Sequence, residues 1–242
     1  MFIYTCKAPS TKHKVQTWFN SKMATKLKQI GLLLFLAFFA VGFAQGPPKE
    51  PGPFRQPDLV ELVKVDPTIK LDIRYATKNN FLGRQVYKQA RAFLQRPAAE
   101  ALIRVNQSLR KQGFGLVVFD GYRPWAVTKI FWDATPEDKK IFVADPSKGS
   151  RHNRGCAVDL SLFDVATGKL VQMPGEYDEM TERSHINYEC AQPESKRLRG
   201  ILRSAMEAEG FAVYEPEWWH YDYKDWKEYP ILDVPFSAIK QP

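Results

Sequence analysis

The sequence predicts an α+β fold in which helices flank a mainly antiparallel sheet. Helical and strand-like segments are intermixed along the chain, without the regular alternation that builds a parallel βαβ sheet. Two short strand-like runs, at residues 211–214 and 218–223, close the chain. No internal repeat is present. These observations favour one domain with a single core.

Three segments are expected to be helices. Residues 97–112 place apolar side chains at spacings of four, three and four, which is one face of a helix. These side chains are Ala98, Leu102, Val105 and Leu109. Residues 194–209 turn a second face inward, formed by Leu198, Ile201, Leu202 and Ala205. Gly113 and Gly210 follow the two segments and are natural terminators. A shorter helix is expected at 126–133.

Strands are expected where apolar residues run together or alternate with polar ones. Before the two closing runs, such strands cover 71–75 (LDIRY), 115–119 (GLVVF) and 157–163 (AVDLSLF). The second of them leads into residues 120–124 (DGYRP), whose glycine and proline predict a turn. The polar stretch around Gly83 is expected to be a loop.

Residues 1–44 are predicted to be a leader that contains a signal peptide. Lys26 and Lys28 precede an apolar run of 14 residues, at 30–43, and small residues lead to a cleavage site before Gln45. The run is shorter than the ~20 apolar residues of a membrane-spanning helix. An uncleaved anchor or a buried helix is the alternative. We therefore expect an exported protein of the periplasm or cell envelope, without stable membrane insertion after cleavage.

The leader also changes the argument from charge. Residues 1–22 are polar and basic and do not resemble a signal peptide, which makes Met23 a better candidate for the true start. The first 44 residues hold six lysines and no acidic residue, so the remaining 198 carry 29 basic and 27 acidic side chains. The net charge of +8 thus mostly reflects the leader, and no nucleic-acid partner is expected.

Residues 45–57 hold five prolines and are expected to form an extended linker before a folded domain at 58–242. Beyond the leader, the two cysteines Cys156 and Cys190 allow at most one disulfide, which excludes a disulfide framework.

The first candidate for chemistry is the segment SRHNRGCAVD, which contains His152 and Asp159. Seven residues span ~23 Å in a straight strand, whereas the ligands of one zinc ion lie ~2 Å from it. The chain must therefore turn back between these two residues if both bind one ion, and Gly155 supplies freedom for that bend. The alternative is an exposed loop histidine and a strand aspartate with ordinary surface hydrogen bonds.

The second candidate is Glu217-Trp218-Trp219-His220. A glutamate three residues before a histidine suits a general base beside a metal ligand. On an ideal strand the two would face opposite sides, so the strand must be twisted, bulged or ending there. The alternative is a tryptophan-rich core strand with one hydrogen-bonded histidine.

Together the two segments supply two histidines, one aspartate and a spare glutamate, and catalytic zinc sites commonly have three protein ligands and an open position. Arg123 follows the predicted strand and turn, and its guanidinium is suited to stabilising an oxyanion. Alternatively, Arg123 is a surface residue paired with Asp120 or another carboxylate.

Four segments closely resemble the zinc-dependent D-alanyl-D-alanine dipeptidases: DGYRP (120–124), SRHNRGCAVDLSL (150–162), ERSH (182–185) and EWWHY (217–221). The resemblance covers nearly all of residues 58–230. The metal-site patterns are shared with the wider group of D,D-peptidases and hedgehog-like zinc domains, so the resemblance implies that α+β fold. The segments at 120–124 and 182–185 restrict the resemblance to the dipeptidases.

The resemblance also implies one zinc ion per chain and a role for each matching residue. The zinc ligands would be His152, Asp159 and His220. Glu217 would be the general base and Arg123 the transition-state stabiliser. Tyr75 and Asp178 match substrate-binding positions. Cys156 replaces the small residue expected there, either as an extra ligand or redox-sensitive group, or as a small buried hydrophobe.

The expected activity is hydrolysis of D-alanyl-D-alanine to two D-alanines, in peptidoglycan turnover or cell-wall peptide salvage. Export argues against a role in vancomycin resistance, which requires the dipeptide to be destroyed in the cytoplasm. One alternative is a D,D-carboxypeptidase that trims peptidoglycan stem peptides. The other is a zinc-containing binding module without catalysis, which Glu217 and Arg123 argue against. No oligomeric state is predicted.

Overall fold

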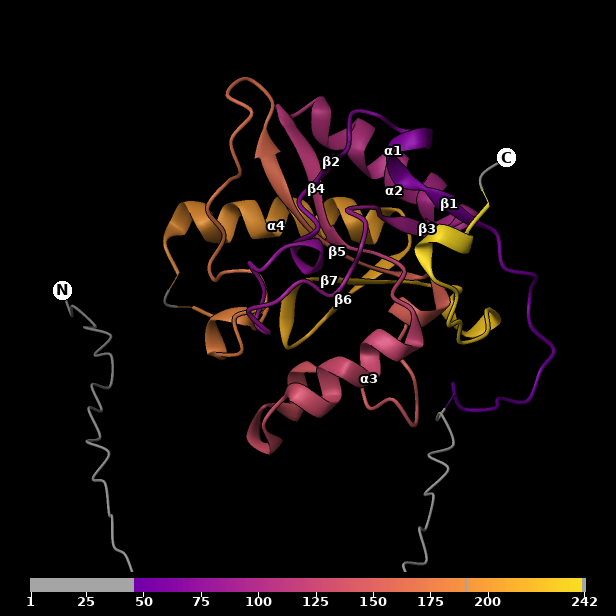
Figure 1. The fold of residues 1–242 in the computed structure, drawn as a ribbon. Coiled ribbons are helices and arrows are strands. Elements are labelled where there is room, and N and C mark those ends of the chain that lie inside the picture. Colours follow the sequence, from indigo (N-terminus) through magenta and orange to yellow (C-terminus); the bar gives the residue numbers. More distant parts are fainter. Residues whose placement is uncertain (1–45, 190, 241–242) are drawn as a thin grey trace, which may run out of the picture. The chain divides into compact units, whose positions relative to one another are not determined.

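The computed structural model describes residues 46–189 and 191–240, and these are built around a five-stranded sheet with the order β2-β4-β5-β7-β6 (Figure 1). The strands are β2 (Lys70–Leu71), β4 (Phe114–Asp120), β5 (Ala157–Asp164), β6 (Phe211–Tyr214) and β7 (Glu217–Tyr223). β2 runs parallel to β4, and every other pair in the sheet is antiparallel. The predicted α+β class and the mainly antiparallel sheet are confirmed.

A second, two-stranded sheet pairs β1 (Leu59–Glu61) with β3 (Phe93–Gln95) in antiparallel fashion. Neither strand was predicted from the sequence, nor was the one-turn helix α1 (Leu62–Val65). Segments of three or four residues are too short to develop a periodic pattern, so they carry little signal.

The three predicted helices are confirmed as α2 (Arg96–Arg110), α3 (Trp125–Ala134) and α4 (Pro193–Ala208). α2 and α4 begin with a proline in the first turn, where the missing N–H costs nothing. Gly113 and Gly210 have φ angles of +85°, which glycine adopts readily just beyond a helix end.

The apolar helix faces meet in the core. α2 and α4 pack against each other; α2 also lies on β4, and α4 on β5 and β6. The four apolar residues expected to face inward from α2 are fully buried. In α4 the buried stripe includes Leu198 and Leu202 as predicted, whereas Ile201 and Ala205 are only partly buried and Met206 completes the stripe. In Figure 1, α3 lies apart from α2 and α4.

The strand expected at 71–75 is wrong for most of its length. β2 ends at Leu71, and residues 74–76 form a 3-10 turn. Ile73 and Tyr75 are both buried. Apolar and polar residues therefore alternate here although the chain does not form a strand. Tyr75 is thereby turned towards the centre of the molecule, where it contacts the site described below.

Further 3-10 turns connect the main elements. They span Glu137–Phe142, His152–Arg154, Glu182–Ser184, Trp226–Glu228 and Phe236–Ala238. The loop around Gly83 is present as expected, with a φ angle of +63° at that glycine.

Residues 46–57 contain no helix or strand, and they are held against the domain. The Glu50 carboxylate pairs with the Arg154 guanidinium, and the Arg55 N–H donates to the Glu228 carbonyl at 2.7 Å. The predicted leader lies outside the described residues. Within the described ranges, no helix has the length and apolar character needed to cross a membrane.

Candidate active site

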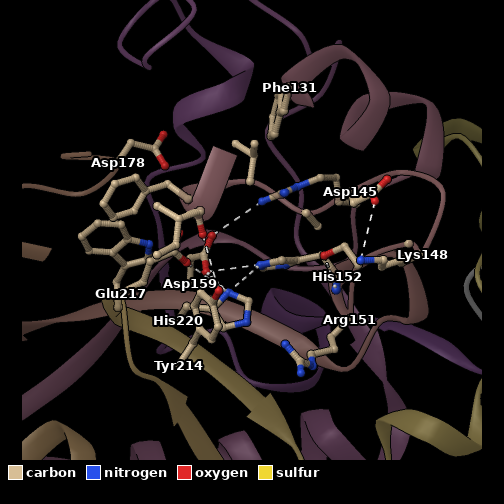
Figure 2. Close-up of a pocket in the computed structure, with 18 of the residues that line it drawn as sticks. Phe131, Asp145, Lys148, Arg151, His152, Asp159, Asp178, Tyr214, Glu217 and His220 are labelled. Carbon is tan, nitrogen blue, oxygen red and sulfur yellow. Dashed lines mark hydrogen bonds and ion pairs between the residues drawn. The ribbon is translucent and has the colours of Figure 1, made fainter. Parts of the chain in front are cut away.

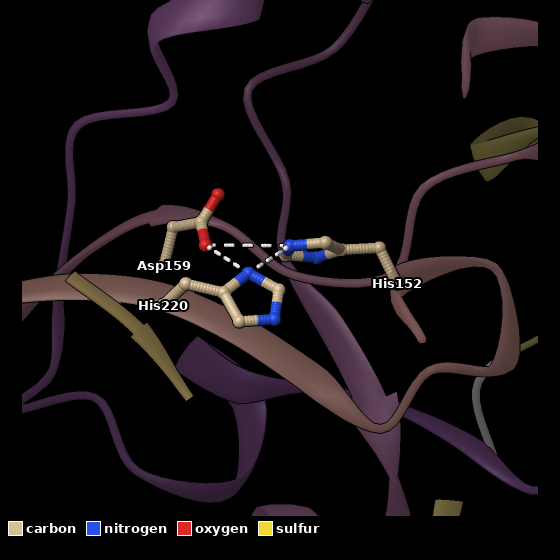
Figure 3. Close-up of side chains that lie close together, drawn as sticks. All are labelled: His152, Asp159 and His220. Atoms are coloured by element: carbon tan, nitrogen blue, oxygen red, sulfur yellow. Dashed lines mark hydrogen bonds and ion pairs between the residues drawn. The ribbon is translucent and has the colours of Figure 1, made fainter. Parts of the chain in front are cut away.

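Three buried side chains converge at the centre of the sheet, as Figure 3 shows. The His152 Nε2 and His220 Nδ1 atoms are 3.1 Å apart. The Asp159 Oδ1 atom lies 3.3 Å from the first nitrogen and 3.1 Å from the second. The three potential ligand atoms therefore surround one point, as the sequence analysis expected.

The backbone brings these residues together in two steps. After the 3-10 turn that contains His152, Gly155 adopts a φ angle of +69° and reverses the chain into β5. A side chain there would come within 2.5 Å of Leu59. Asp159 then lies on β5 directly opposite His220 on β7 in the strand register. The predicted bend at Gly155 is confirmed.

Outer partners orient all three groups. The His152 Nδ1–H donates to the Gly121 carbonyl at 2.7 Å, which leaves the Nε2 lone pair facing the centre. The His220 Nε2–H donates to Asp222 at 2.9 Å, which leaves Nδ1 facing the centre. The Tyr177 hydroxyl donates to the Asp159 Oδ2 atom at 3.1 Å. Such supporting hydrogen bonds are typical around metal ligands, because they fix the tautomer and the ring orientation.

This arrangement fits a small divalent cation. Atoms that share a tetrahedral zinc ion at ~2.0–2.1 Å lie about 3.3 Å from one another, close to the spacing observed here. Positive charge is needed where these atoms meet: the proton of His220 supplies it without a metal, and a bound cation would take its place. Burial opposes ionisation of Asp159, but the two neighbouring histidines hold the pKa of its carboxyl well below the usual value. Burial likewise lowers the pKa of His220, but Asp222 and Asp159 together raise it to about 10.

Glu217 reaches the same site because β7 is irregular. Tyr214 on β6 pairs with Glu217, whereas the preceding residue, Val213, pairs with Tyr221, so the register shifts between them. The Glu217 Oε2 atom consequently lies 3.7 Å from the His220 Nδ1 atom. Burial raises the pKa of Glu217 to about 8, helped by the Asp159 charge. A carboxylate beside the cluster but not part of it is suited to accept a proton.

Arg123 is buried and lies on the opposite side of Asp159. Two of its nitrogens, Nε and Nη2, lie 2.9 Å from Asp120, and Nη2 lies 3.8 Å from Asp159. The guanidinium also stacks over the Phe131 ring, 4.7 Å from its centroid. Arg123 therefore does pair with Asp120, as the alternative interpretation expected. However, the residue is buried at the site and not on the surface.

Tyr75 and Asp178 line the same cleft and meet there, although they are 103 residues apart in sequence. The Tyr75 hydroxyl donates to the Asp178 Oδ1 atom at 3.0 Å. The Asp178 Oδ2 atom is buried and has no hydrogen-bond partner among the described residues. Burial, assisted by the Asp159 charge, raises the pKa of Asp178 to about 7. Asp178 also has a φ angle of +62°, which few residues other than glycine, asparagine and aspartate adopt.

All seven predicted site residues line one cleft of about 340 Å³. In the view of Figure 2, Asp178 and Glu217 lie towards one end, and Asp145 and Lys148 towards the other. A cleft of this volume with convergent polar groups is typical of a small-molecule site. The structure thus brings these seven residues together, while their chemical roles stay predictions.

The sequence analysis missed the supporting residues Tyr177 and Asp222. Asp222 had a usable signal, because residues two apart on a strand face the same side. Tyr177 had none, since it comes from a loop without periodicity. Cys156 is fully buried, and its sulfur contacts the Arg154 carbonyl at 3.7 Å rather than the cluster. This placement favours the small buried hydrophobe.

Comparison with known proteins agrees with the site. The sequence profile of the D-ala-D-ala dipeptidase family matches residues 55–240. The D-alanyl-D-alanine dipeptidase of Escherichia coli is 35% identical over 185 residues, which cover 76% of this chain and 94% of that protein. The Enterococcus faecium D-alanyl-D-alanine dipeptidase is 37% identical over 183 residues, covering 67% and 89%.

Among solved structures, the LdcB LD-carboxypeptidase has a TM-score of 0.41 and 19% identity, over 78% of this chain and 82% of that one. This likeness is too weak to carry an argument, whereas the sequence matches span most of both chains. The chain therefore belongs to the D-ala-D-ala dipeptidase family of metallopeptidases.

Proposed function

We propose that the chain is a zinc-dependent dipeptidase that hydrolyses D-alanyl-D-alanine to two D-alanines. The observation that carries the proposal is the set of three mutual distances of 3.1–3.3 Å between the ligand atoms of His152, Asp159 and His220. These residues would hold the ion, and Gly121, Tyr177 and Asp222 would keep them oriented. Family membership and the names of its relatives support the substrate.

When bound, zinc would polarise the scissile carbonyl and acidify a water molecule. Glu217 would accept the proton of that water and pass it to the leaving amine, since it lies beside the cluster without belonging to it. Burial raises the pKa of Glu217 in the metal-free protein, and a bound zinc ion would lower it towards the ionised form that a general base requires.

Arg123 would stabilise the negative charge that develops on the carbonyl oxygen. Asp120 holds the guanidinium from one side and Phe131 packs under it, so little reorganisation is needed during the reaction. A fixed charge in a water-poor site is worth more than the same charge in bulk solvent.

Asp178 would bind the free amino group of the substrate. Asp178 lines the cleft, and its buried Oδ2 atom has no hydrogen-bond partner among the described residues, so a substrate ammonium group would satisfy it. This contact favours a dipeptide over a longer peptide, in which the same nitrogen belongs to an amide. It therefore weighs against the D,D-carboxypeptidase alternative.

The test compares D-alanyl-D-alanine with its N-acetylated form, using the zinc-loaded protein. The free dipeptide should be cleaved and the acetylated form should not, because the latter has no ammonium group for Asp178. Cleavage of the acetylated form alone would make the chain a carboxypeptidase. Glu217→Ala should lose hydrolysis and retain zinc by metal analysis, and unchanged hydrolysis would refute the assigned base.

The cellular setting is also part of the proposal. We infer an exported enzyme that acts on dipeptide released from peptidoglycan, on the strength of the signal-peptide pattern before Gln45. Determining the N-terminal residue of the mature protein tests this directly. Gln45 at the N-terminus supports export, whereas an intact leader in a cytoplasmic fraction contradicts it.

A further inference from the structure

A second pocket lies between α4 and the strands β6 and β7, and it shares no lining residue with the catalytic cleft. Its volume is about 160 Å³. Figure 1 shows the long helix α4 beside these strands. The proposed catalytic mechanism makes no use of this pocket, so its chemistry needs a separate explanation.

Three cationic side chains of α4 line the pocket: Lys196, Arg199 and Arg203. They are three or four residues apart, which places them along one side of the helix. All three are only partly exposed. Like charges so close together are unfavourable unless an anion lies near them.

Two carboxylates compensate part of this positive charge. The Lys196 ammonium group lies 3.0 Å from Glu189, and the Arg203 Nε atom lies 2.7 Å from Glu207. Arg199 has no such partner among the described residues. Its Nη1 atom donates to the carbonyls of His185 and Tyr188, each at 3.3 Å. Burial lowers the pKa of Arg199, and the Glu189 charge opposes this shift without cancelling it.

Two neutral donors from β7 complete the lining. The Trp218 Nε1 and Tyr221 hydroxyl groups are buried and have no hydrogen-bond partner in the described part of the chain. Leaving such a group unpaired is costly. Burial raises the pKa of the Tyr221 hydroxyl. The Glu207 carboxylate adds to this shift and the Arg203 and Arg199 charges oppose it, so the hydroxyl lies near charges of both signs.

Gly200 lines the pocket between the cationic residues. It lies inside α4, where glycine is less stable than alanine by roughly 0.5–1 kcal/mol. A side chain at this position would meet no other atom within 4 Å. The glycine therefore relieves no clash, and this part of the pocket faces open space.

We propose that this pocket binds a small oxyanion, a carboxylate or a phosphate group. The Arg199 guanidinium, which makes no close ion pair among the described residues, supplies the charge, and the Trp218 and Tyr221 groups supply hydrogen bonds that nothing else in the described residues accepts. Charged and neutral donors converging on one small space are what an oxyanion requires.

The test is titration calorimetry of the zinc-loaded protein with inorganic phosphate and, separately, with acetate. Saturable binding of one molecule of either anion per chain is expected, and the tighter of the two identifies the ligand class. Arg199→Ala should weaken binding roughly tenfold or more, and Tyr221→Phe by a factor of about 2 to 10. Arg197→Ala is the matched control, because this arginine lies on the same helix, paired with Glu194 and outside the pocket.

Tyr221→Phe also tests the lining without the anion. Because its hydroxyl has no partner, removing it should leave the stability of the anion-free protein unchanged or raised. A clear loss of stability would show that the hydroxyl is already satisfied and would overturn the proposal. So would an absence of saturable binding, or binding that both pocket variants leave unchanged, which would locate the anion at the zinc cluster instead.

Discussion

The charge of Asp178 is predicted to lower the stability of the protein and to strengthen substrate binding. The substitution Asp178→Asn tests both effects. Asparagine has the same shape, accepts the Tyr75 hydrogen bond and tolerates the φ angle of +62°. It removes only the charge on the unpartnered carboxylate. We therefore expect a variant that is more stable at neutral pH and less active.

The size of the effect follows from the pKa of Asp178, which burial raises from 3.8 to about 7. Because the folded state holds this proton more tightly than the unfolded state, the stability of the native protein falls as the pH rises from about 4 to 7. The loss amounts to at most about 4 kcal/mol at pH 8 but only about 2 kcal/mol at pH 5. Asparagine does not titrate, so its advantage should grow with pH over this window.

The assay is urea denaturation of the metal-free protein at pH 5 and pH 8, since a bound cation would itself lower the pKa of Asp178. The free energy of unfolding of Asp178→Asn should exceed that of the native protein by more at pH 8 than at pH 5. Asp178→Ala is the control: it also removes the charge, but it loses the Tyr75 bond and places a less tolerant residue at a positive φ angle. Its gain should be smaller.

Hydrolysis provides the second measurement. Losing a charge-assisted hydrogen bond to the substrate ammonium should raise KM about 10- to 100-fold. An Asp178→Asn protein whose advantage in stability is the same at both pH values would refute the reasoning. That result would mean that the carboxyl group keeps an ordinary pKa and that its Oδ2 atom already has a partner.

Three further outcomes test other parts of the site. Asp222→Asn should reduce zinc affinity about 10- to 100-fold in a chelator competition, because the partner that orients His220 is weakened; unchanged affinity would remove Asp222 from the site. Arg123→Lys should lower kcat about 100-fold or more with little change in zinc content, since an ammonium group cannot reproduce the guanidinium contacts; an unaltered kcat would contradict its role. Gly155→Ala should destabilise the protein by about 2 kcal/mol in urea denaturation, because its φ angle is +69° and a side chain would collide with Leu59; native-like stability would show that the turn is not required.

The sequence predicted the long elements well, and for a physical reason. α2 and α4 each bury an apolar stripe over about four turns, so their periodicity is strong. The short elements β1, β3 and α1 depend on tertiary contacts rather than on a local pattern. The segment around Tyr75 shows the same limit, since alternating burial predicted a strand where the chain makes a turn.

The site was predictable to the extent that its residues carry distinctive chemistry. Histidines are few in this chain, so His152 and His220 were conspicuous. The partner of His152 was not, because the backbone carbonyl of Gly121 leaves no trace in the sequence. Distance in the chain hid Tyr177, whose hydroxyl reaches Asp159 across 18 residues of loop and strand.

The irregularity of β7 connects the catalytic cleft with the second pocket. In a regular strand, Glu217 and His220 would point to opposite faces. The shifted register places Glu217, Trp219 and His220 in the cleft, whereas Trp218 and Tyr221 line the pocket below α4. Any straightening of this strand would move the general base away from the zinc cluster and the two donors away from the arginines. The same local distortion therefore determines the geometry of both sites, and the strand pattern alone could predict neither.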